Sequence, residues 1–284
     1  MAAIIVWSIA LLISLAGLIV SINSQRFARA IATDARALWV TASTSPAPRA
    51  IDLRALPDPV RRYLQRAGVE QRSAIRSVRL RHDGSMTLSP GAKPIPVQGR
   101  QYFAADPPGF VWWGRVRVAP GIWIDARDEV IDGQGGMKVV FESTRTLQDV
   151  TGPTLDQGAL TRLLGELAWM PTALLDDRYV TWEAVDDSRA RARLRVNGRE
   201  VVATFHFGPD GLPLRFTADR YRDLGNGQAA LTPFVGTLND WRSVDGLLVP
   251  FAVEASWILD GQPFTFARFQ VQALEFDRPL PFGN

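Results

Sequence analysis

The chain has 284 residues, of which 46% are hydrophobic and 21% charged, so a chain that is disordered over most of its length is excluded. The net charge is only +3 and the arginines are dispersed, without a basic run interleaved with aromatic residues, so we expect no nucleic-acid partner. The absence of cysteine excludes disulfides, thiolate catalysis and cysteine-ligated metals.

The N-terminus begins with an apolar stretch, residues 2–22, that carries no charged side chain. It is long enough to cross a hydrocarbon core of about 30 Å as a helix. It is also longer than the core of an ordinary signal peptide, and no basic segment precedes it. We therefore predict an uncleaved transmembrane anchor over residues 1–24, with the bilayer as a partner, over the alternative of a cleaved signal.

The orientation of this single-pass protein is not decided by the sequence. Arg26, Arg29 and Arg36 follow the span, so the positive-inside rule favours a cytoplasmic C-terminal side. The fold predicted below usually works outside the cytoplasm. The predicted fold therefore favours a soluble domain in the periplasm of a bacterial envelope, whereas the arginines favour a cytoplasmic one. The sequence leaves both orientations open.

Residues 25–50 are predicted to form a membrane-proximal helix and a linker. The helix can continue to Val40 with an amphipathic pattern, and its arginines can meet anionic headgroups. Its apolar side chains near one face are Phe27, Ile31 and Leu38. Thr41–Arg49 is small, polar and punctuated by proline, which is typical of an extended spacer. A single domain is expected over residues 51–284.

The domain begins with a short predicted helix, Pro57–Gly68, which has proline in its first turn and glycine at its C-terminal end. Its expected buried stripe is Val60, Tyr63 and Leu64. From about Ile75 the period of the apolar pattern changes from about 3.6 to 2. In Arg189–Val196, arginines alternate with apolar residues, so one face of that strand meets water and the other a core.

Tight hairpin turns are indicated by dipeptides of Asn or Asp with Gly, which tolerate positive φ. They are Asp83-Gly84, Asp132-Gly133, Asn197-Gly198, Asp210-Gly211, Asn226-Gly227, Asp245-Gly246 and Asp260-Gly261. We predict about 11–12 antiparallel strands, five between Ile75 and Ser143 and about seven between Tyr179 and Phe276. Glycine-rich Asp132–Gly136 precedes a strand, so it is a turn and no phosphate cradle.

The predicted fold class is mainly β (α+β), a strongly curved antiparallel sheet or incomplete β-barrel with a central covering helix. An open sheet of this size would leave edges and an uncovered apolar face. Strands 109–118 and 263–271 are apolar on both faces. A sheet buried on both sides needs a helix on one face or an enclosed cavity.

The covering helix is predicted over residues 156–170, within the stretch Asp156–Leu175. Asp156 is the expected N-cap, and Pro171 ends the helix and opens a second short turn. Its buried face repeats at helical spacing through Leu160, Leu163, Leu164 and Leu167.

Catalytic and metal chemistry are weakly indicated. His82 and His206 are the only histidines and lack the spacing of a metal motif, so we predict no metal and no cofactor. Glu166 and Asp128 are weak catalytic candidates for a hydrolase of envelope lipid or glycan. Arg162 and Glu166 lie one helical turn apart, and the commoner interpretation of such a pair is a solvated ion pair.

The nine tryptophans carry more information about function. Core packing explains most of them, but a pocket lined by several indoles would suit an acyl chain whose head is oriented by polar groups. The predicted ligand-binding residues are Trp112, Leu163, Leu167, Trp169, Trp182 and Trp257, with Arg162, Glu166 and Arg220 as polar candidates.

A family resemblance rests on Arg162–Leu175, on Tyr179–Glu183, on Ala218–Arg222 and on Asp240-Trp-Arg. Its most specific part is Glu-x-x-Trp-x-Pro-Thr at Glu166–Thr172. In these stretches the chain resembles an uncharacterised bacterial family of membrane-anchored proteins, from about Leu56 to Phe276. The resemblance implies no activity. More coarsely, the strand count with a mid-chain helix is similar to the incomplete barrels of periplasmic lipoprotein carriers.

The leading functional hypothesis is non-enzymatic binding of a lipid or other apolar ligand in a β cavity beneath the helix. The first alternative is the hydrolase that acts through paired carboxylates. The second is a structural scaffold at the membrane, which would present a contiguous exposed apolar patch and no internal cavity.

Overall fold

The computed structural model describes residues 1–44, 52–225 and 227–283. The helices of this part are α1 (Ala2–Thr44), α2 (Asp58–Ala67) and α3 (Pro153–Glu166). The strands that precede α3 are β1 (Ser77–Met86), β2 (Ile95–Ala105), β3 (Pro108–Ala119), β4 (Ile122–Ile131), β5 (Gln134–Phe141) and β6 (Arg145–Thr151). The strands that follow it are β7 (Val180–Asp186), β8 (Arg189–Val196), β9 (Arg199–Phe207), β10 (Pro213–Gly225), β11 (Gln228–Val244), β12 (Leu247–Leu259) and β13 (Gln262–Phe276).

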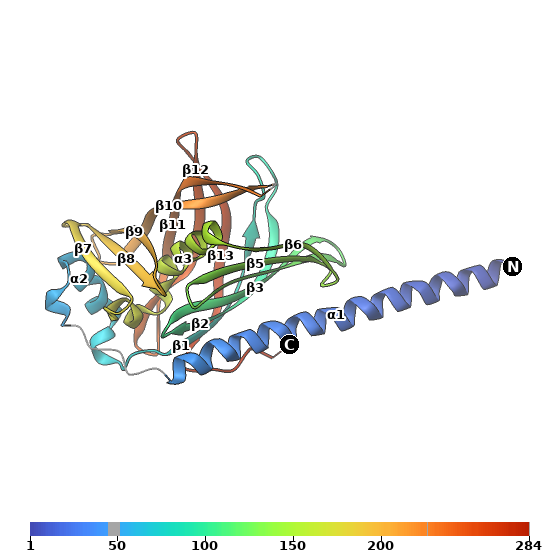
Figure 1. The fold of residues 1–284 in the computed structure, drawn as a ribbon, viewed down its shortest axis with the longest axis horizontal. Helices are drawn as coiled ribbons and strands as arrows, with labels where there is room; N and C mark the ends of the chain where they lie inside the picture. Colours follow the sequence, from blue (N-terminus) through green and yellow to red (C-terminus); the bar gives the residue numbers. More distant parts are fainter. Residues whose placement is uncertain (45–51, 226, 284) are drawn as a thin grey trace.

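All strands of the described chain belong to one antiparallel sheet in the order β6-β5-β4-β3-β2-β1-β13-β12-β11-β10-β9-β8-β7. The chain starts at the centre of the sheet and runs outward to β6. It then crosses the concave face through α3 and returns from β7 to the centre (Figure 1). The sheet curves around α3, and this confirms the predicted incomplete barrel with a covering helix.

The strand count is higher than predicted, because thirteen strands are present in the described residues and one of the additional ones is β6. All seven residues of β6 are exposed, so the strand lacks the apolar alternation by which the others are recognised. The strand is held by backbone pairing with β5, in which Gly136 lies opposite Thr151 at one end and Phe141 lies opposite Arg145 at the other.

Most predicted turns are confirmed, with Asp or Asn and Gly at positive φ in Asp132-Gly133, Asn197-Gly198, Asp245-Gly246 and Asp260-Gly261. Gly211 also has positive φ, whereas Asn226 lies outside the described residues. The turn predicted at Asp83-Gly84 is wrong, because β1 continues through both residues. A Cβ on Gly84 would lie 2.0 Å from the carbonyl oxygen of Arg268, so this glycine serves close strand approach.

Helix α1 is continuous from the apolar stretch into the domain. Its second half packs against β2 and β3 on the convex side of the sheet, where Ile31, Ala35, Leu38 and Trp39 are buried. The amphipathic face predicted for this segment is therefore covered by protein. The predicted spacer is wrong at its start, since the helix runs on through Thr44 and the first proline comes at Pro46. Residues 45–49 lie outside the described part.

Helix α2 is confirmed as predicted. Val60, Tyr63 and Leu64 are fully buried, and Gly68 ends the helix in the left-handed conformation with φ of 84°.

Helix α3 has the predicted apolar face, and Leu160, Leu163, Leu164 and Leu167 are all buried. The helix begins at Pro153 and ends at Glu166, before short 3-10 turns at Leu167–Trp169 and Pro171–Leu175. The prediction of Asp156 as N-cap is wrong, because Pro153 starts the helix one turn earlier. The buried Asp156 carboxylate instead accepts hydrogen bonds from Gly135 N at 2.7 Å and Arg199 Nε at 2.8 Å. It therefore ties the helix to β5 and β9.

Candidate functional site

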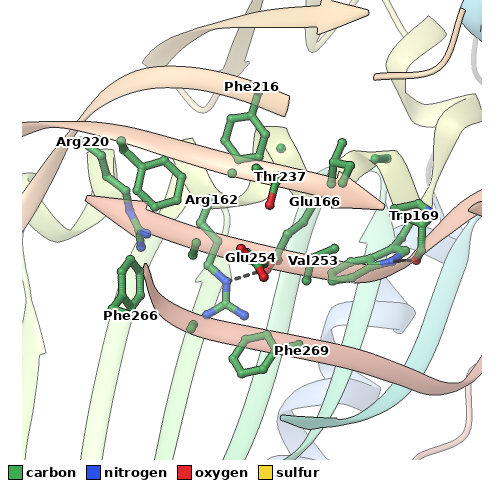
Figure 2. A pocket seen from close by; sticks show the side chains of 18 of the residues that line it. Arg162, Glu166, Trp169, Phe216, Arg220, Thr237, Val253, Glu254, Phe266 and Phe269 are labelled. Carbon is green, nitrogen blue, oxygen red and sulfur yellow. Dashed lines mark hydrogen bonds and ion pairs between the residues drawn. The ribbon is translucent and has the colours of Figure 1, made fainter. Parts of the chain in front are cut away.

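A cavity of about 120 Å³ lies on the concave face, between the C-terminal end of α3 and strands β10 to β13. Figure 2 shows it from close by. Six of its lining side chains are aromatic, and they belong to Trp112, Trp169, Phe216, Phe234, Phe266 and Phe269. Trp169 is held in place because its indole N–H donates to the carbonyl of Pro250 at 2.7 Å. The cavity therefore has rigid apolar walls of the kind that ligand pockets share.

One side of the cavity carries a network of charged groups centred on Arg162. Its Nε donates to Glu166 Oε1 at 2.8 Å and its Nη1 to Asp128 Oδ2 at 2.8 Å. Gln101 Nε2 donates to the second oxygen of Glu166 at 2.7 Å. The side chain of Arg162 is only 14% exposed, so the expectation of a solvated Arg162–Glu166 pair is wrong. The approach of β2 and β4 to the helix excludes water from this pair.

The charge of Arg162 is compensated. Burial opposes the charged form, but Glu166 and Asp128 outweigh it and raise the pKa of Arg162 above its ordinary value. The guanidinium carbon also lies 4.7 Å from the ring centroid of Phe110 and 5.2 Å from that of Trp112, which gives cation–π contacts.

Arg220, from β10, is the second cation of the cavity, and its charge is not compensated in the same way. Its Nε donates to the carbonyl of Gly158 at 2.8 Å. Its guanidinium lies over the rings of Phe234 and Trp257, at 5.0 and 5.5 Å. Among the residues that the structure describes, no carboxylate lies within 4.0 Å of it. Burial and the charge of Arg162 lower the pKa of Arg220 to about 10.

Two further polar atoms near the cavity lack hydrogen-bond partners within the described chain, Thr237 Oγ1 and His82 Nδ1. Thr237 lines the cavity directly. His82 lies behind Trp112, whose indole N–H donates to His82 Nε2 at 2.8 Å. Burial, with the charge of Arg162, lowers the pKa of His82 to about 3, so this imidazole is neutral at physiological pH.

The predicted site residues divide into four groups. The fold brings six of them together around the cavity: Trp112, Asp128, Arg162, Glu166, Trp169 and Arg220. Trp257 lies behind the wall, where its ring stacks on Phe266 at 5.4 Å between centroids. Leu163 and Leu167 are buried in the core beneath α3. Trp182 lies away from the cavity, where it donates to the carbonyl of Leu174 at 3.1 Å.

The paired carboxylates do not form an open acid–base site. Asp128 and Glu166 bind the same guanidinium, which occupies the position that a scissile bond would need between them. No group of three or more His, Cys, Asp or Glu residues that could hold a metal occurs in the described ranges. The arrangement is therefore suited to binding an apolar group beside a cation.

Sequence reasoning missed four of the aromatic walls, Phe216, Phe234, Phe266 and Phe269, and also Thr237. These residues are spread over β10, β11 and β13, and no local pattern groups them. One indirect signal was present, because Gly165 lies inside a helical pattern where glycine is unfavourable. A Cβ on Gly165 would lie 2.0 Å from the ring of Phe216, so this glycine marks the place where the ring meets the helix.

Comparison with known protein families identifies one family model that matches this chain. A model described as a family of unknown function (DUF6544) matches residues 46–269. Among curated proteins, none matches the chain significantly.

Similar solved structures share little sequence with this chain. A DUF1329 family protein from Desulfovibrio piger has 15% identity and a TM-score of 0.44, over 79% of this chain and 96% of the other. An outer membrane lipoprotein-sorting protein domain from Vibrio parahaemolyticus has 9% identity and a TM-score of 0.42, over 78% and 95%. A LolA superfamily protein from Nitrosomonas europaea has 13% identity and a TM-score of 0.36, over 77% and 93%. At these values the likenesses carry no conclusion about ligands.

Proposed function

The chain belongs to the family of unknown function DUF6544, and from that premise we propose a membrane-tethered protein that binds a single-chain anionic amphiphile. The ligand tail occupies the aromatic cavity and its anionic head pairs with Arg220. No covalent chemistry is part of this proposal.

The observation that carries the proposal is the position of Arg220 beside an apolar cavity. A half-buried guanidinium without a carboxylate partner is costly, since desolvation of a cation is offset only when a counter-charge is supplied. Glu166 and Asp128 are already engaged by Arg162. A carboxylate or phosphate head on the ligand would supply the missing counter-charge, with a charge-assisted hydrogen bond to the free guanidinium nitrogens.

The size of the cavity limits the tail. A dry cavity of roughly 150 Å³ in an engineered protein holds one benzene molecule. The cavity here is about 120 Å³, so it fits one small ring or the end of one acyl chain. This argues for a single-chain ligand, with the remainder of the molecule outside the walls, and against a complete multi-chain lipid.

The tether is supported by the first half of α1. Residues 4–19 are exposed on the protein surface, and the most apolar window of the helix has a mean hydropathy of 2.6 with none of it buried in the protein. Such a surface is unfavourable in water, and its length matches the hydrocarbon core of a bilayer.

Photo-crosslinking tests the binding proposal in the full chain reconstituted in lipid nanodiscs. The probe is dodecanoate with a diazirine at the end of the tail, compared with the matching uncharged dodecanol. We expect adducts of the acid on the cavity walls, Phe216, Phe234 and Phe266. Adducts found only on the outer surface would contradict the proposal.

The role of Arg220 is tested with Arg220→Met. Loss of one charge-assisted hydrogen bond of about 1.5–3 kcal/mol weakens dodecanoate binding by roughly 10- to 150-fold and leaves dodecanol unchanged. The matched control is Arg215→Met, an exposed arginine on the same strand. Equal binding of the acid by wild type and Arg220→Met would remove Arg220 from the site.

A further inference from the structure

The direction of α1 relative to the sheet is fixed by polar contacts at the point where the apolar stretch ends. Arg115 Nη2 of β3 donates to Ser24 Oγ at 2.8 Å, and Asn23 Nδ2 donates to Thr144 Oγ1 at 3.4 Å. Further along the helix, Leu38 contacts the start of β3, since a Cβ on Gly109 would lie 3.0 Å from its side chain. Helix α1 and β3 therefore run side by side in opposite directions.

This arrangement places the β3–β4 hairpin on the membrane side of Ser24. From Arg115 the strand continues for four residues to Ala119, an advance of about 13 Å at roughly 3.3 Å per residue. About nine helical residues cover the same length at 1.5 Å each, so the hairpin tip is level with the uncharged part of α1. The hairpins of β3 to β6 and the free end of α1 extend toward the same side (Figure 1).

The hairpin tip, defined as Val118–Ile122, is apolar and exposed. It reads Val-Ala-Pro-Gly-Ile and has no charged side chain. Val118 is 51% exposed and Ile122 is 39% exposed. A turn that faces only water would more often carry polar residues, and here apolar side chains are presented beside the span.

A positively charged groove lies directly behind this tip on the convex face. Four arginines line it, Arg81, Arg100, Arg115 and Arg117, with Asp83 as the carboxylate among its lining residues. Trp113 lines the same groove, and Trp123 follows the tip on β4. The guanidinium of Arg115 lies 5.4 and 4.7 Å from these two indole rings. Tryptophan and arginine are the residues that favour the headgroup layer of a bilayer.

The shape of the hairpin is held by a buried carboxylate. Asp125 is fully buried and accepts hydrogen bonds from Arg115 Nε, from the indole N–H of Trp113 and Trp123, and from Ser143 Oγ. These bonds join β3, β4 and the β5–β6 turn, while Arg115 also contacts α1. The base of the hairpin is therefore connected to the helix through Arg115.

From this arrangement we propose that the tip inserts into the same bilayer leaflet that α1 enters, and that the arginine groove binds anionic lipid headgroups. The proposal rests on the tether of the proposed function and is independent of the ligand cavity. Its consequence is a domain held at a fixed angle to the membrane by two contacts, instead of one that swings on a single helix.

The test uses the natural absence of cysteine, which makes any introduced cysteine unique. Full-length Ile122→Cys, Leu12→Cys and Leu214→Cys are labelled with the fluorophore NBD and reconstituted into vesicles that contain nitroxide-labelled acyl chains. Leu214 is exposed near the opposite end of the sheet and serves as the control. We expect at least twofold quenching at positions 122 and 12 and none at 214.

The outcomes separate the two proposals. Quenching at position 12 without quenching at 122 would overturn the hairpin contact and leave the tether in place. An unquenched probe at position 12 would reject the tether itself, and with it the membrane part of the proposed function.

Lipid selectivity is tested by comparing phosphatidylcholine vesicles with vesicles that also contain phosphatidylglycerol. We expect stronger quenching at position 122 in the anionic vesicles, and loss of this difference in Arg100→Gln/Arg117→Gln. The control is Arg191→Gln/Arg195→Gln on β8, which changes the net charge equally. Equal quenching in both lipid mixtures would overturn the headgroup groove.

Discussion

At the scale of single residues, the cavity depends on how Phe216 is placed. Its ring lies against two glycines, Gly165 of α3 and Gly236 of β11, where an added Cβ would come within 2.0 and 2.2 Å of ring atoms. No other residue type leaves this space, so the two glycines allow the helix and the strand to approach the ring from both sides. The ring then forms part of the cavity wall.

Substitution of Gly165 tests this packing. In an exposed helix interior, alanine would be more stable than glycine by about 1 kcal/mol. We expect Gly165→Ala instead to lower the free energy of unfolding by about 1–3 kcal/mol, because the ring of Phe216 must move. Gly158→Ala in the same helix is the control, since its Cβ comes no closer than 3.4 Å to a neighbour. Chemical denaturation of the detergent-solubilised chain measures the free energy of unfolding of both variants. Equal stabilisation by Gly165→Ala and Gly158→Ala would contradict the close packing of Phe216 against Gly165.

At the scale of elements, α1 has two halves with different surroundings. The first is exposed and apolar, whereas the second is buried against β2 and β3. Trp39 donates its indole N–H to the carbonyl of Phe103 at 2.9 Å, and Asp34 pairs with Arg127 at 3.0 Å. The burial of this half is therefore specific, and this half of the helix is a part of the domain.

Truncation of a buried side chain in α1 tests the docking of its second half. Leu38→Ala is expected to lower the free energy of unfolding by about 2–4 kcal/mol, since it leaves a cavity against β3. Hydrogen exchange should then accelerate in residues 28–40 and stay slow in the span. Val40→Ala, at a position that is 64% exposed, is the control and should change neither. Unchanged exchange in Leu38→Ala would mean that the helix is not docked in solution.

At the scale of the whole molecule, the two halves of the curved sheet, β1–β6 and β7–β13, contact each other at one end of the incomplete barrel. Asn197, in the β8–β9 turn, donates to the carbonyl of Asp132 in the β4–β5 turn at 3.1 Å. A Cβ on Gly133 would lie 2.7 Å from the carbonyl oxygen of Val196. The ion pair of the buried Asp156 with Arg199 lies between the same halves. Helix α3 and these turns together hold the curvature that forms the cavity.

Two turn glycines with similar positive φ allow the contact between the two halves of the sheet to be tested separately from the backbone strain of the turn. Gly133 and Gly198 have φ of 75° and 77°, but a Cβ on Gly198 would meet no atom within 4 Å. Gly198→Ala is expected to cost about 1 kcal/mol of stability from the left-handed backbone alone. Gly133→Ala should cost clearly more, and exchange at the amides of Asn197 and Gly198 should accelerate. Equal losses in the two variants would argue against a closing contact at this end.

The predictions that succeeded depend on local patterns. The long apolar helix, the buried stripe of α2, the apolar face of α3 and most of the turns all follow from residue spacing within one element. The family resemblance is confirmed as well. Predictions failed where the local pattern gave no signal or where tertiary contacts decided the outcome. The exposed strand β6 was not predicted, Asp83-Gly84 is not a turn, and Asp156 is not the N-cap.

The sequence by itself determined the kinds of element, their order and the apolar segment that can enter a membrane, because helix and strand periodicity are properties of neighbouring residues. Only the tertiary structure decided the cavity and the position of the β3–β4 hairpin beside α1. Phe216 and Arg220 come from β10, Phe234 from β11 and Phe266 from β13, and strand pairing and sheet curvature alone bring them to one place. The same holds for Ser24 and Arg115, whose contact sets the direction of α1 relative to β3 and is made across 91 residues of chain.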